Sequence, residues 1–342
     1  MKLLVAIFIL LSSTVACFAG ESTITFTYAG QSRSSLIYVP NSYNANTPST
    51  LVLCLHGTTQ LNTVYRDLIN MYPIADTANF IVLIPQGLYD LVAGFTWNSG
   101  AGAQGYYPNS SVDDIGFLKA LLDTVKANYN VNSNGVFATG FSMGGFMCNK
   151  IACNNTLGIK AIASVAGTIG SGVTCNTTTP MPFMHIHGTS DGVVGYTANN
   201  FGTDAEPTVK KWITVNGCDT NAIVTNITNS NNDNITFTHY KYNNPGNPYY
   251  DVEFYKANGA NHVWYTSNQD INYSKEIWLF FKRHIGFATA VNQTTPQATI
   301  LSTSYYNLWG QPITNSKAAI PGTMLQITRY SDGSTKQKMI VQ

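Results

Sequence analysis

The chain has 342 residues, of which 44% are hydrophobic and 10% charged, and its formal net charge is +1. This length is enough for one large hydrophobic core and a small additional module. The near-neutral charge excludes the basic surface that nucleic-acid-binding proteins need. No C-x-x-C pair or zinc-type Cys/His spacing occurs, so we expect no metal site and no cofactor.

Residues 1–19 have the pattern of a signal peptide. Lys2 supplies the positive start, residues 3–11 form an apolar run, and small residues lead to an expected cleavage site after Ala19. The run is too short to span a bilayer, and no other stretch is long and apolar enough to do so. We therefore expect a secreted protein without stable membrane insertion. A lipid anchor on Cys17 remains an alternative.

After this segment, strand-like and helix-like patterns alternate along the chain. Alternating or continuous apolar runs predict strands at residues 23–28, 36–39, 50–55, 80–84, 135–139, 159–165, 183–186 and 252–255. Helical spacing and end signals predict helices after Asp113 or Asp114, after residue 142, from Pro207 toward Gly217, and over Ser274–His284. A turn around residues 30–34 joins the first two strands, and residues 219–250 form an elaborated loop or hairpin.

This alternation predicts an α/β fold with a mostly parallel sheet covered by helices on both faces. We expect one domain over residues 20–288 and a polar linker over residues 289–304. Residues 305–342 are expected to form a small β-module, because two strand-like runs flank the turn signal at residues 331–334.

The stretch Gly140–Gly144 has the form G-x-S-x-G, with Ser142 at its centre. A β-prone run precedes it and apolar residues at helical spacing follow it, which is the strand–turn–helix context of a nucleophile elbow. A serine held on a strained turn needs neighbours without Cβ atoms. We expect Ser142 to be a nucleophile; the alternative is an ordinary glycine-rich turn.

Two later residues complete a candidate triad. On a sheet of this kind the order is Ser, then Asp or Glu, then His, each on a loop after a strand. Asp191 follows the expected strand at 183–186, and His262 follows the expected strand at 252–255. His262 would take the proton of Ser142, and Asp191 would orient and stabilise the imidazolium.

The other candidates for these two roles fit their positions less well. Asp204 and Asp251 do not follow apolar strands. The remaining histidines are expected to have structural roles in the core, at a strand end, at a helix end or in an insertion: His56, His185, His187, His239 and His284.

Two backbone N–H groups are candidates for an oxyanion hole. Met143 begins the expected helix after Ser142, so its N–H points toward developing negative charge. Thr58 follows Gly57 at the end of an expected strand, where the backbone can turn its N–H inward. An ordinary turn at Gly57 is the alternative.

Aromatic residues crowd the loops expected around this site. We take Trp97, Tyr196 and Trp264 as candidate substrate-binding residues, although large aromatics also commonly fill space beneath loops. The same loops contain Tyr106, Tyr107 and Tyr265.

The motifs together resemble the feruloyl esterase and polyhydroxybutyrate depolymerase-like group of secreted α/β-hydrolases, within carbohydrate esterase family 1. The resemblance covers residues 23–287 and rests on LHGTTQ (55–60), PQG (85–87), TWNSG (96–100), VDDIGFLKALLD (112–123), ATGFSMGG (138–145), IHGTSDGVVGY (186–196) and NHVW (261–264). It implies the triad Ser142, Asp191 and His262, with Thr58 and Met143 as oxyanion donors.

The resemblance also bears on the cysteines. Five remain after Cys17, an odd number; Cys54 lies in an apolar strand and is expected to be a small core residue. The resemblance implies a disulfide between Cys153 and Cys175. Cys218 matches a cysteine that often pairs downstream in relatives, but no cysteine follows it here.

The tail separately resembles the C-terminal sorting signal of type IX secretion in Bacteroidota, which implies the secretion machinery as a partner. The matching residues are 306–312, 320–322, 329–334 and 338–341. A small β-module that binds polysaccharide or packs on the main domain is the alternative.

Taken together, the residues and the resemblance predict a secreted serine esterase that forms an acyl-enzyme. The expected substrate is a feruloyl or related hydroxycinnamoyl ester on plant cell-wall polysaccharide. Acetyl-xylan, polyhydroxyalkanoates and aromatic polyesters are alternative substrates. A peptidase, or a non-catalytic polysaccharide-binding protein on the same scaffold, is the alternative from another class.

Overall fold

The computed structural model describes residues 19–267, 269–286, 300–306, 323–330 and 335–341. The chain divides into two compact units, residues 1–287 and 288–342. Most of the expected signal peptide and parts of the expected linker and tail lie outside the described residues. Within the described residues, no helix combines the length and hydropathy that a membrane span requires.

The first unit is built on a ten-stranded sheet. Its strands are β1 (Gly20–Tyr28), β2 (Gln31–Val39), β3 (Ser49–Leu55), β4 (Phe80–Pro85), β7 (Val131–Phe141), β8 (Ala161–Val165), β9 (Phe183–Gly188), β10 (Ile223–Ile227), β11 (Thr236–Tyr242) and β12 (Val252–Asn258). They lie in the order β1-β2-β4-β3-β7-β8-β9-β12-β11-β10. The strands from β4 to β12 in this order are parallel, and an antiparallel hairpin borders them on each side.

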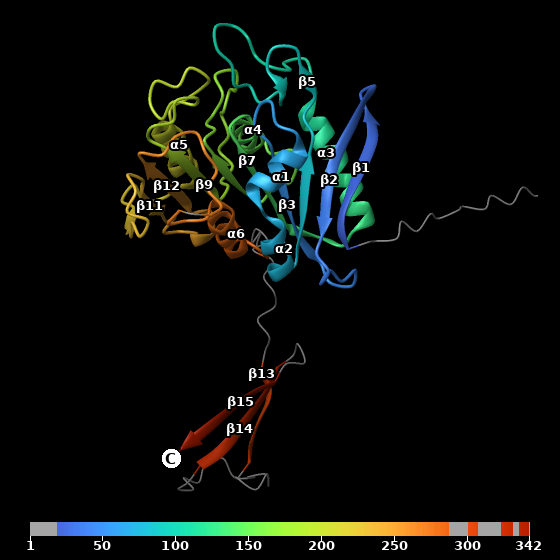
Figure 1. The fold of residues 1–342 in the computed structure, drawn as a ribbon. Coiled ribbons are helices and arrows are strands. Elements are labelled where there is room, and N and C mark those ends of the chain that lie inside the picture. Colours follow the sequence, from blue (N-terminus) through green and yellow to red (C-terminus); the bar gives the residue numbers. More distant parts are fainter. Residues whose placement is uncertain (1–18, 268, 287–299, 307–322, 331–334, 342) are drawn as a thin grey trace, which may run out of the picture. The chain divides into compact units, whose positions relative to one another are not determined.

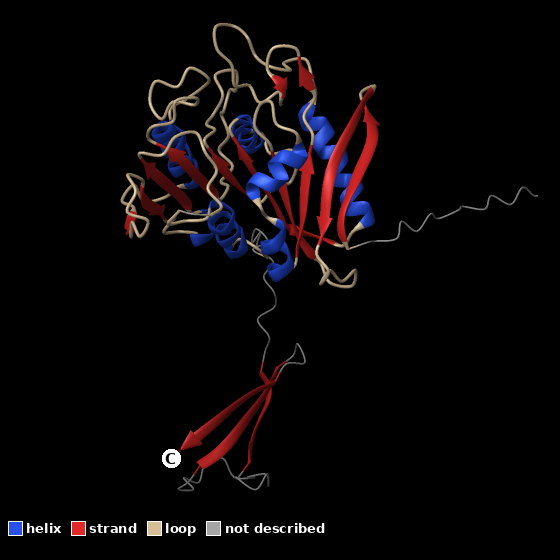
Figure 2. Cartoon of the chain, in the orientation of Figure 1, coloured by secondary structure: helices blue, strands red, loops and turns tan. Residues whose placement is uncertain are grey.

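Helices cover both faces of this sheet (Figures 1 and 2). The helices are α1 (Asn62–Ile69), α2 (Tyr72–Ala78), α3 (Asp114–Asn128), α4 (Met143–Cys153), α5 (Ala205–Asn216) and α6 (Tyr273–Arg283). Strand β3 shows why its apolar run is continuous. Leu51 and Leu53 pack in the core formed with α3, α4 and α5, whereas Val52 and Cys54 pack in the core formed with α1, α2 and α6. The predicted α/β class is confirmed.

The structure corrects several boundaries. The first hairpin turns at Ala29 and Gly30, both with positive φ, so residues 31–34 belong to β2 rather than to a turn. Helices α1 and α2 were not predicted. Residues 219–250 contain the hairpin β10–β11. Asp113 is the cap of α3, and its carboxylate accepts a hydrogen bond from the N–H of Gly116 at 2.9 Å.

The second unit contains a three-stranded antiparallel sheet. Its strands are β13 (Ile300–Tyr306), β14 (Thr323–Tyr330) and β15 (Thr335–Val341), in the order β13-β14-β15. Residues 300–304, which were expected to be linker, therefore lie in a strand.

Candidate active site

Ser142 lies at the junction between β7 and α4. Its backbone angles, φ 55° and ψ −119°, are a strained conformation for a residue with a side chain. The turn is possible because its neighbours lack Cβ atoms. A Cβ on Gly144 would lie 1.9 Å from the carbonyl oxygen of Leu55, and one on Gly140 would lie 2.3 Å from the carbonyl oxygen of Gly144. Ser142 therefore projects from a sharp strand-to-helix turn.

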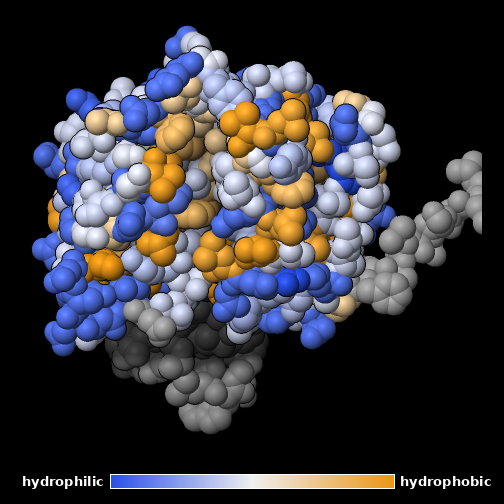
Figure 3. Space-filling model, turned by 45° about the horizontal axis from the view of Figure 1, so that its top comes forward, coloured by the Kyte–Doolittle hydropathy of each residue, from blue (hydrophilic) through white to orange (hydrophobic). Residues whose placement is uncertain are grey.

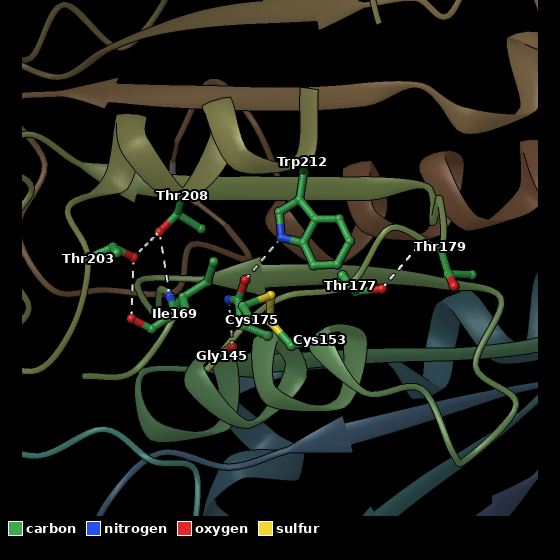
Figure 4. The surroundings of a disulfide bond; sticks show 10 residues. Gly145, Cys153, Ile169, Cys175, Thr177, Thr179, Thr203, Thr208 and Trp212 are labelled. Carbon is green, nitrogen blue, oxygen red and sulfur yellow. Dashed lines mark hydrogen bonds between the residues drawn. A yellow bond between two sulfur atoms is a disulfide. The ribbon is translucent and has the colours of Figure 1, made fainter. Parts of the chain in front are cut away.

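Helix α4, which carries this turn, is anchored along its length (Figure 4). Asn149 is buried and donates through Nδ2 to the carbonyl oxygens of Gly145 and Gly167, both at 3.1 Å. At the end of the helix, Cys153 forms a disulfide with Cys175 on the segment before β9. The disulfide predicted by resemblance is confirmed; it ties the C-terminal end of α4 to the segment before β9, and Asn149 ties the middle of the helix to the backbone at Gly167.

Asp191 and His262 meet at the carboxyl ends of β9 and β12. Nδ1 of His262 lies 2.8 Å from Oδ2 of Asp191. The other carboxylate oxygen accepts hydrogen bonds from the N–H groups of Val193 and Val194, at 2.9 and 2.8 Å. Burial alone would raise the pKa of Asp191, but the hydrogen bond and charge of His262 and these two N–H groups outweigh it and lower that pKa. Asp191 is thus held ionised against His262.

Two further histidines lie behind this carboxylate. Nε2 of His187 lies 2.8 Å from the carbonyl oxygen of Val194 and 3.5 Å from Oδ2 of Asp191. Because a carbonyl can only accept, Nε2 of His187 carries the hydrogen. Its Nδ1 lies 3.1 Å from Nε2 of His185 and accepts there. Burial lowers the pKa of both histidines, so each is neutral, as the core role expected for them requires.

The end of β3 packs against the nucleophile turn. A Cβ on Gly57 would lie 3.3 Å from the Cβ of Ser142. The buried ring of His56 fixes this segment, because its Nδ1 donates to the carbonyl oxygen of Gly57 at 2.7 Å and its Nε2 accepts from the N–H of Gly87 at 2.9 Å. Thr58 follows directly and lines the same pocket as Ser142.

A pocket of about 260 Å³ opens beside Ser142. Met143 lines it as well; as the first residue of α4, it has a backbone N–H without an intrahelical acceptor. The rest of the lining consists mainly of small or apolar residues: Ala93, Ala101, Gly102, Ala103, Tyr106, Pro108, Phe146, Val193, Val194 and Phe201. In Figure 3 the side of the unit that carries β5 (Tyr89–Asp90) comes forward, and hydrophobic patches are interspersed there with hydrophilic residues.

The three aromatics predicted to bind substrate need correction. Trp97 is fully buried, and its indole donates to the carbonyl oxygen of His56 at 2.9 Å. Trp264 is 3% exposed and donates to Ser274, and Tyr196 is 8% exposed and donates to Glu206. None of the three is among the lining residues of the pocket. Their rings fill space beneath the loops, which is the alternative role that the sequence analysis left open for them.

The pocket wall contains residues that the sequence reasoning missed. Three consecutive small residues, Ala101–Ala103, create the space, and Phe146 and Phe201 supply aromatic area. Small residues in a loop do not by themselves indicate from the sequence that a pocket lies there. Tyr106, one of the aromatic residues on the loops around the site, also lines the pocket.

The rival residues lie elsewhere. Asp251 is at the start of β12, at the opposite end of the strand from the His262 loop, and pairs with His284 at 2.9 Å. Asp204 is at the N-terminus of α5. His239 lies beside Glu253 on the β11 hairpin. Among the described residues, no group of three or more His, Cys, Asp or Glu is placed to hold a metal ion.

Comparison with known proteins adds to this geometry. Residues 27–177 match the family described as "Putative esterase". The chain is 28% identical over 183 residues to feruloyl esterase D of Neurospora crassa, covering 50% of this chain and 58% of that protein. It is 29% identical over 167 residues to a bifunctional acetylxylan esterase/xylanase of Neocallimastix patriciarum, covering 49% and 22%. The chain thus spans less than two thirds of these relatives.

Solved structures show the same fold. An acetyl xylan esterase from Aspergillus awamori superposes with a TM-score of 0.52 at 19% identity, covering 76% of this chain and 98% of that one. An S-formylglutathione hydrolase from Agrobacterium tumefaciens superposes with a TM-score of 0.51 at 12% identity, covering 78% and 95%. The first unit therefore has the α/β-hydrolase fold.

Proposed function

We propose that this chain is a carboxylic-ester hydrolase that works through an acyl-enzyme on Ser142. The observation that carries the proposal is the hydrogen bond between His262 and Asp191 on the two loops that follow β9 and β12, together with Ser142 on a strained turn of the same sheet. Similarity to a family described as putative esterase and to feruloyl and acetylxylan esterases supports it.

The reaction follows from the chemistry of these groups. Asp191 occupies Nδ1 of His262, which leaves Nε2 to accept the proton of Ser142 as its Oγ attacks the ester carbonyl carbon. The N–H groups of Thr58 and Met143 stabilise the negative charge that forms on the carbonyl oxygen. His262 then gives its proton to the leaving alcohol, and an acyl-enzyme remains.

Water completes the cycle by the same route. His262 accepts a proton from water, whose oxygen attacks the acyl carbon, and the second tetrahedral intermediate collapses to release the acid. Ser142 regains its proton from His262. Within the site only Ser142 and His262 change their protonation state; Asp191 stays ionised, and the N–H groups of Thr58 and Met143 only donate hydrogen bonds.

We propose a hydroxycinnamoyl group, such as feruloyl, as the acyl part of the substrate. The pocket beside Ser142 is about 260 Å³ and is lined mainly by apolar residues, including Phe146 and Phe201. An acetyl group would fill only a small part of it, whereas an aromatic acyl chain would bury most of its surface there. A feruloylated plant polysaccharide is accordingly the proposed polymer; acetyl-xylan, polyhydroxyalkanoates and aromatic polyesters are the alternatives.

We also propose that the protein is secreted. The signal-peptide pattern of residues 1–19 supports export, and the motifs of residues 305–342 support delivery by type IX secretion machinery. Deleting residues 305–342 should retain the protein in the periplasm of a host with that machinery. Unimpaired export of the deletion variant would assign the second unit another role.

The test of the proposed function compares two esters. The purified full chain should hydrolyse methyl ferulate, and Ser142→Ala should lower turnover by about 10⁴-fold to 10⁶-fold without loss of the fold. Cleavage of p-nitrophenyl acetate without cleavage of methyl ferulate would support the proposed mechanism but contradict the proposal that the acyl group is a hydroxycinnamoyl group. Binding of polysaccharide without hydrolysis of any ester would instead favour a non-catalytic protein.

A further inference from the structure

A carboxylate outside the triad joins the two loop segments that form one wall of the pocket. Asp90 lies in the short hairpin of β5 and β6 (Gly94–Phe95). Its Oδ1 accepts hydrogen bonds from the N–H groups of Val92 and Ala93, both at 2.9 Å, and from the hydroxyl of Tyr106. Its Oδ2 accepts from the N–H of Asn109 at 3.1 Å.

Both of the joined segments reach the pocket. Ala93 in the hairpin lines it, and so do Tyr106 and Pro108 in the second segment, residues 103–109. The side chain of Asn109 adds hydrogen bonds to the carbonyl oxygens of Leu88 and Thr96, at 3.0 and 3.2 Å. Polar contacts centred on Asp90 and Asn109 therefore connect the hairpin to residues 103–109.

Pro108 is buried, but apolar burial contributes little at the other parts of this wall. The hairpin tip is open to solvent, with Leu91 94% and Val92 79% exposed, and Tyr106 is 41% exposed. Where little apolar area is buried, hydrogen bonds decide which of several loop conformations is populated. Hydrogen bonds to an ionised acceptor are about twice as strong as neutral ones.

We propose that Asp90 is a positioning residue that sets the acyl-group specificity of the pocket. By holding the β5–β6 hairpin against residues 103–109, it keeps Ala93, Tyr106 and Pro108 in contact with the distal part of a bulky acyl group. An acetyl group on Ser142 is too short to need that wall. This inference rests on the proposed esterase function and adds a determinant of its substrate range.

The carboxylate is required because it can only accept hydrogen bonds. The hydrogen bond from Tyr106, followed by those from the backbone N–H groups, lowers the pKa of Asp90, so the group stays ionised. In Asp90→Asn the amide oxygen can replace Oδ1, but the amide NH₂ would then face the N–H of Asn109 as donor against donor. The variant keeps the size of the side chain, loses the hydrogen bond from the N–H of Asn109, and offers the hydroxyl of Tyr106 a neutral and therefore weaker acceptor.

The first experiment measures kcat and KM of the full chain for methyl ferulate and for p-nitrophenyl acetate. In Asp90→Asn the ratio of kcat/KM for ferulate to that for acetate should fall on the order of tenfold, mainly through a higher KM for ferulate. Asp123→Asn, which removes a surface carboxylate paired with Lys119 on α3, should leave the ratio unchanged. An unchanged ratio in Asp90→Asn, or an equal loss for both esters, would overturn the proposal.

A double-mutant cycle tests the link itself. Tyr106→Phe removes the hydroxyl that bonds to Asp90 and keeps the ring in the pocket wall. The cycle pairs it with Asp90→Ala, which removes both carboxylate oxygens; if Tyr106 acts through Asp90, the double variant should show no larger a change in the ratio than Asp90→Ala alone. Fully additive effects would show that Asp90 does not act through Tyr106.

These assays distinguish a failure of the specificity proposal from a failure of the proposed esterase function. If the wild-type chain cleaves neither ester, the proposed function fails and the ratio cannot be formed. If the chain cleaves both esters and Ser142→Ala abolishes both activities, the function holds, and the Asp90→Asn ratio alone decides the specificity proposal.

Discussion

The ring of His187 donates a 2.8 Å hydrogen bond to the carbonyl oxygen of Val194, and the N–H of Val194 in turn donates a 2.8 Å hydrogen bond to Asp191. One peptide turn is thus held from both sides, by a buried neutral histidine and by the carboxylate that orients His262. Since Val193 and Val194 also line the pocket, the same turn supports both the proposed triad and the proposed acyl site.

His187 should therefore matter for turnover even though it touches no substrate. His187→Phe removes the donor to Val194 and should lower kcat by up to about 10²-fold, because misplacing a catalytic group by about 1 Å costs that much. His187→Gln, which retains an N–H donor, should restore part of the loss. KM should change less than kcat in steady-state assays with methyl ferulate.

A matched control is His239→Gln, because His239 lies on the β11 hairpin and contacts Glu253 rather than the triad. It should leave kcat unchanged. Equal kcat values for His187→Phe and the wild type would show that the turn is held without this hydrogen bond.

Burial of neutral histidines makes stability depend on pH. Burial lowers the pKa of His56 from 6.5 to about 4. Between these values the unfolded chain binds a proton that the folded chain does not, so the free energy of unfolding rises with pH in this window and is lost as pH falls. The shift corresponds to roughly 3 kcal/mol. His185 and His187 act in the same direction.

Urea unfolding at several pH values between about 4 and 7 measures this effect. His56→Gln should show a smaller gain in unfolding free energy across this range than the wild type. A gain equal to that of the wild type would mean that His56 is not buried as a neutral group.

The disulfide between Cys153 and Cys175 should stabilise the first unit. It closes a loop with a sequence separation of 22, for which restriction of the unfolded chain amounts to about 3 kcal/mol. Cys153→Ser combined with Cys175→Ser should lower the unfolding free energy by that order in a urea titration. Cys218→Ser should have little effect, because Cys218 forms no disulfide with any cysteine in the described part of the chain; equal losses in both variants would contradict the assignment.

The pocket should select by size. Ala103→Phe places a large side chain at a lining position and should lower kcat/KM for methyl ferulate by about tenfold or more relative to p-nitrophenyl acetate. Ser110→Phe, at an exposed position on the same loop, should leave the ratio unchanged. A ratio that is equally unaffected by Ala103→Phe would place the acyl group elsewhere.

Local chemistry explains what the sequence could predict. The strand β3 could be predicted from its continuous apolar run, because both of its faces are buried. The turn at Ser142 could be predicted from Gly140 and Gly144, because any Cβ there would clash with backbone. The positions of Asp191 and His262 after strands indicated that the two could meet, because parallel strands end at one edge of a sheet. Their hydrogen bond shows that these loops do converge.

What the sequence could not predict depends on contacts between distant segments. Trp97 and Tyr106 lie on the same loop between β6 and α3, yet Trp97 is fully buried against His56 whereas Tyr106 lines the pocket. Residues 31–34 are polar, which predicted a turn, but Arg33 is buried and forms an ion pair with Asp114 at 2.8 Å, 81 positions away. The role of Asp90 likewise depends on donors from residues 106 and 109.

The most direct test of the central claim is to trap the nucleophile. The full chain is treated with a p-nitrophenyl phosphonate, a reagent that phosphonylates activated serines, and the modified peptide is identified by mass spectrometry. We predict a single modification on Ser142, with release of p-nitrophenol, that is absent in Ser142→Ala and much slower in His262→Ala. Modification of another residue, or none in a chain that hydrolyses methyl ferulate, would contradict the acyl-enzyme mechanism proposed for Ser142.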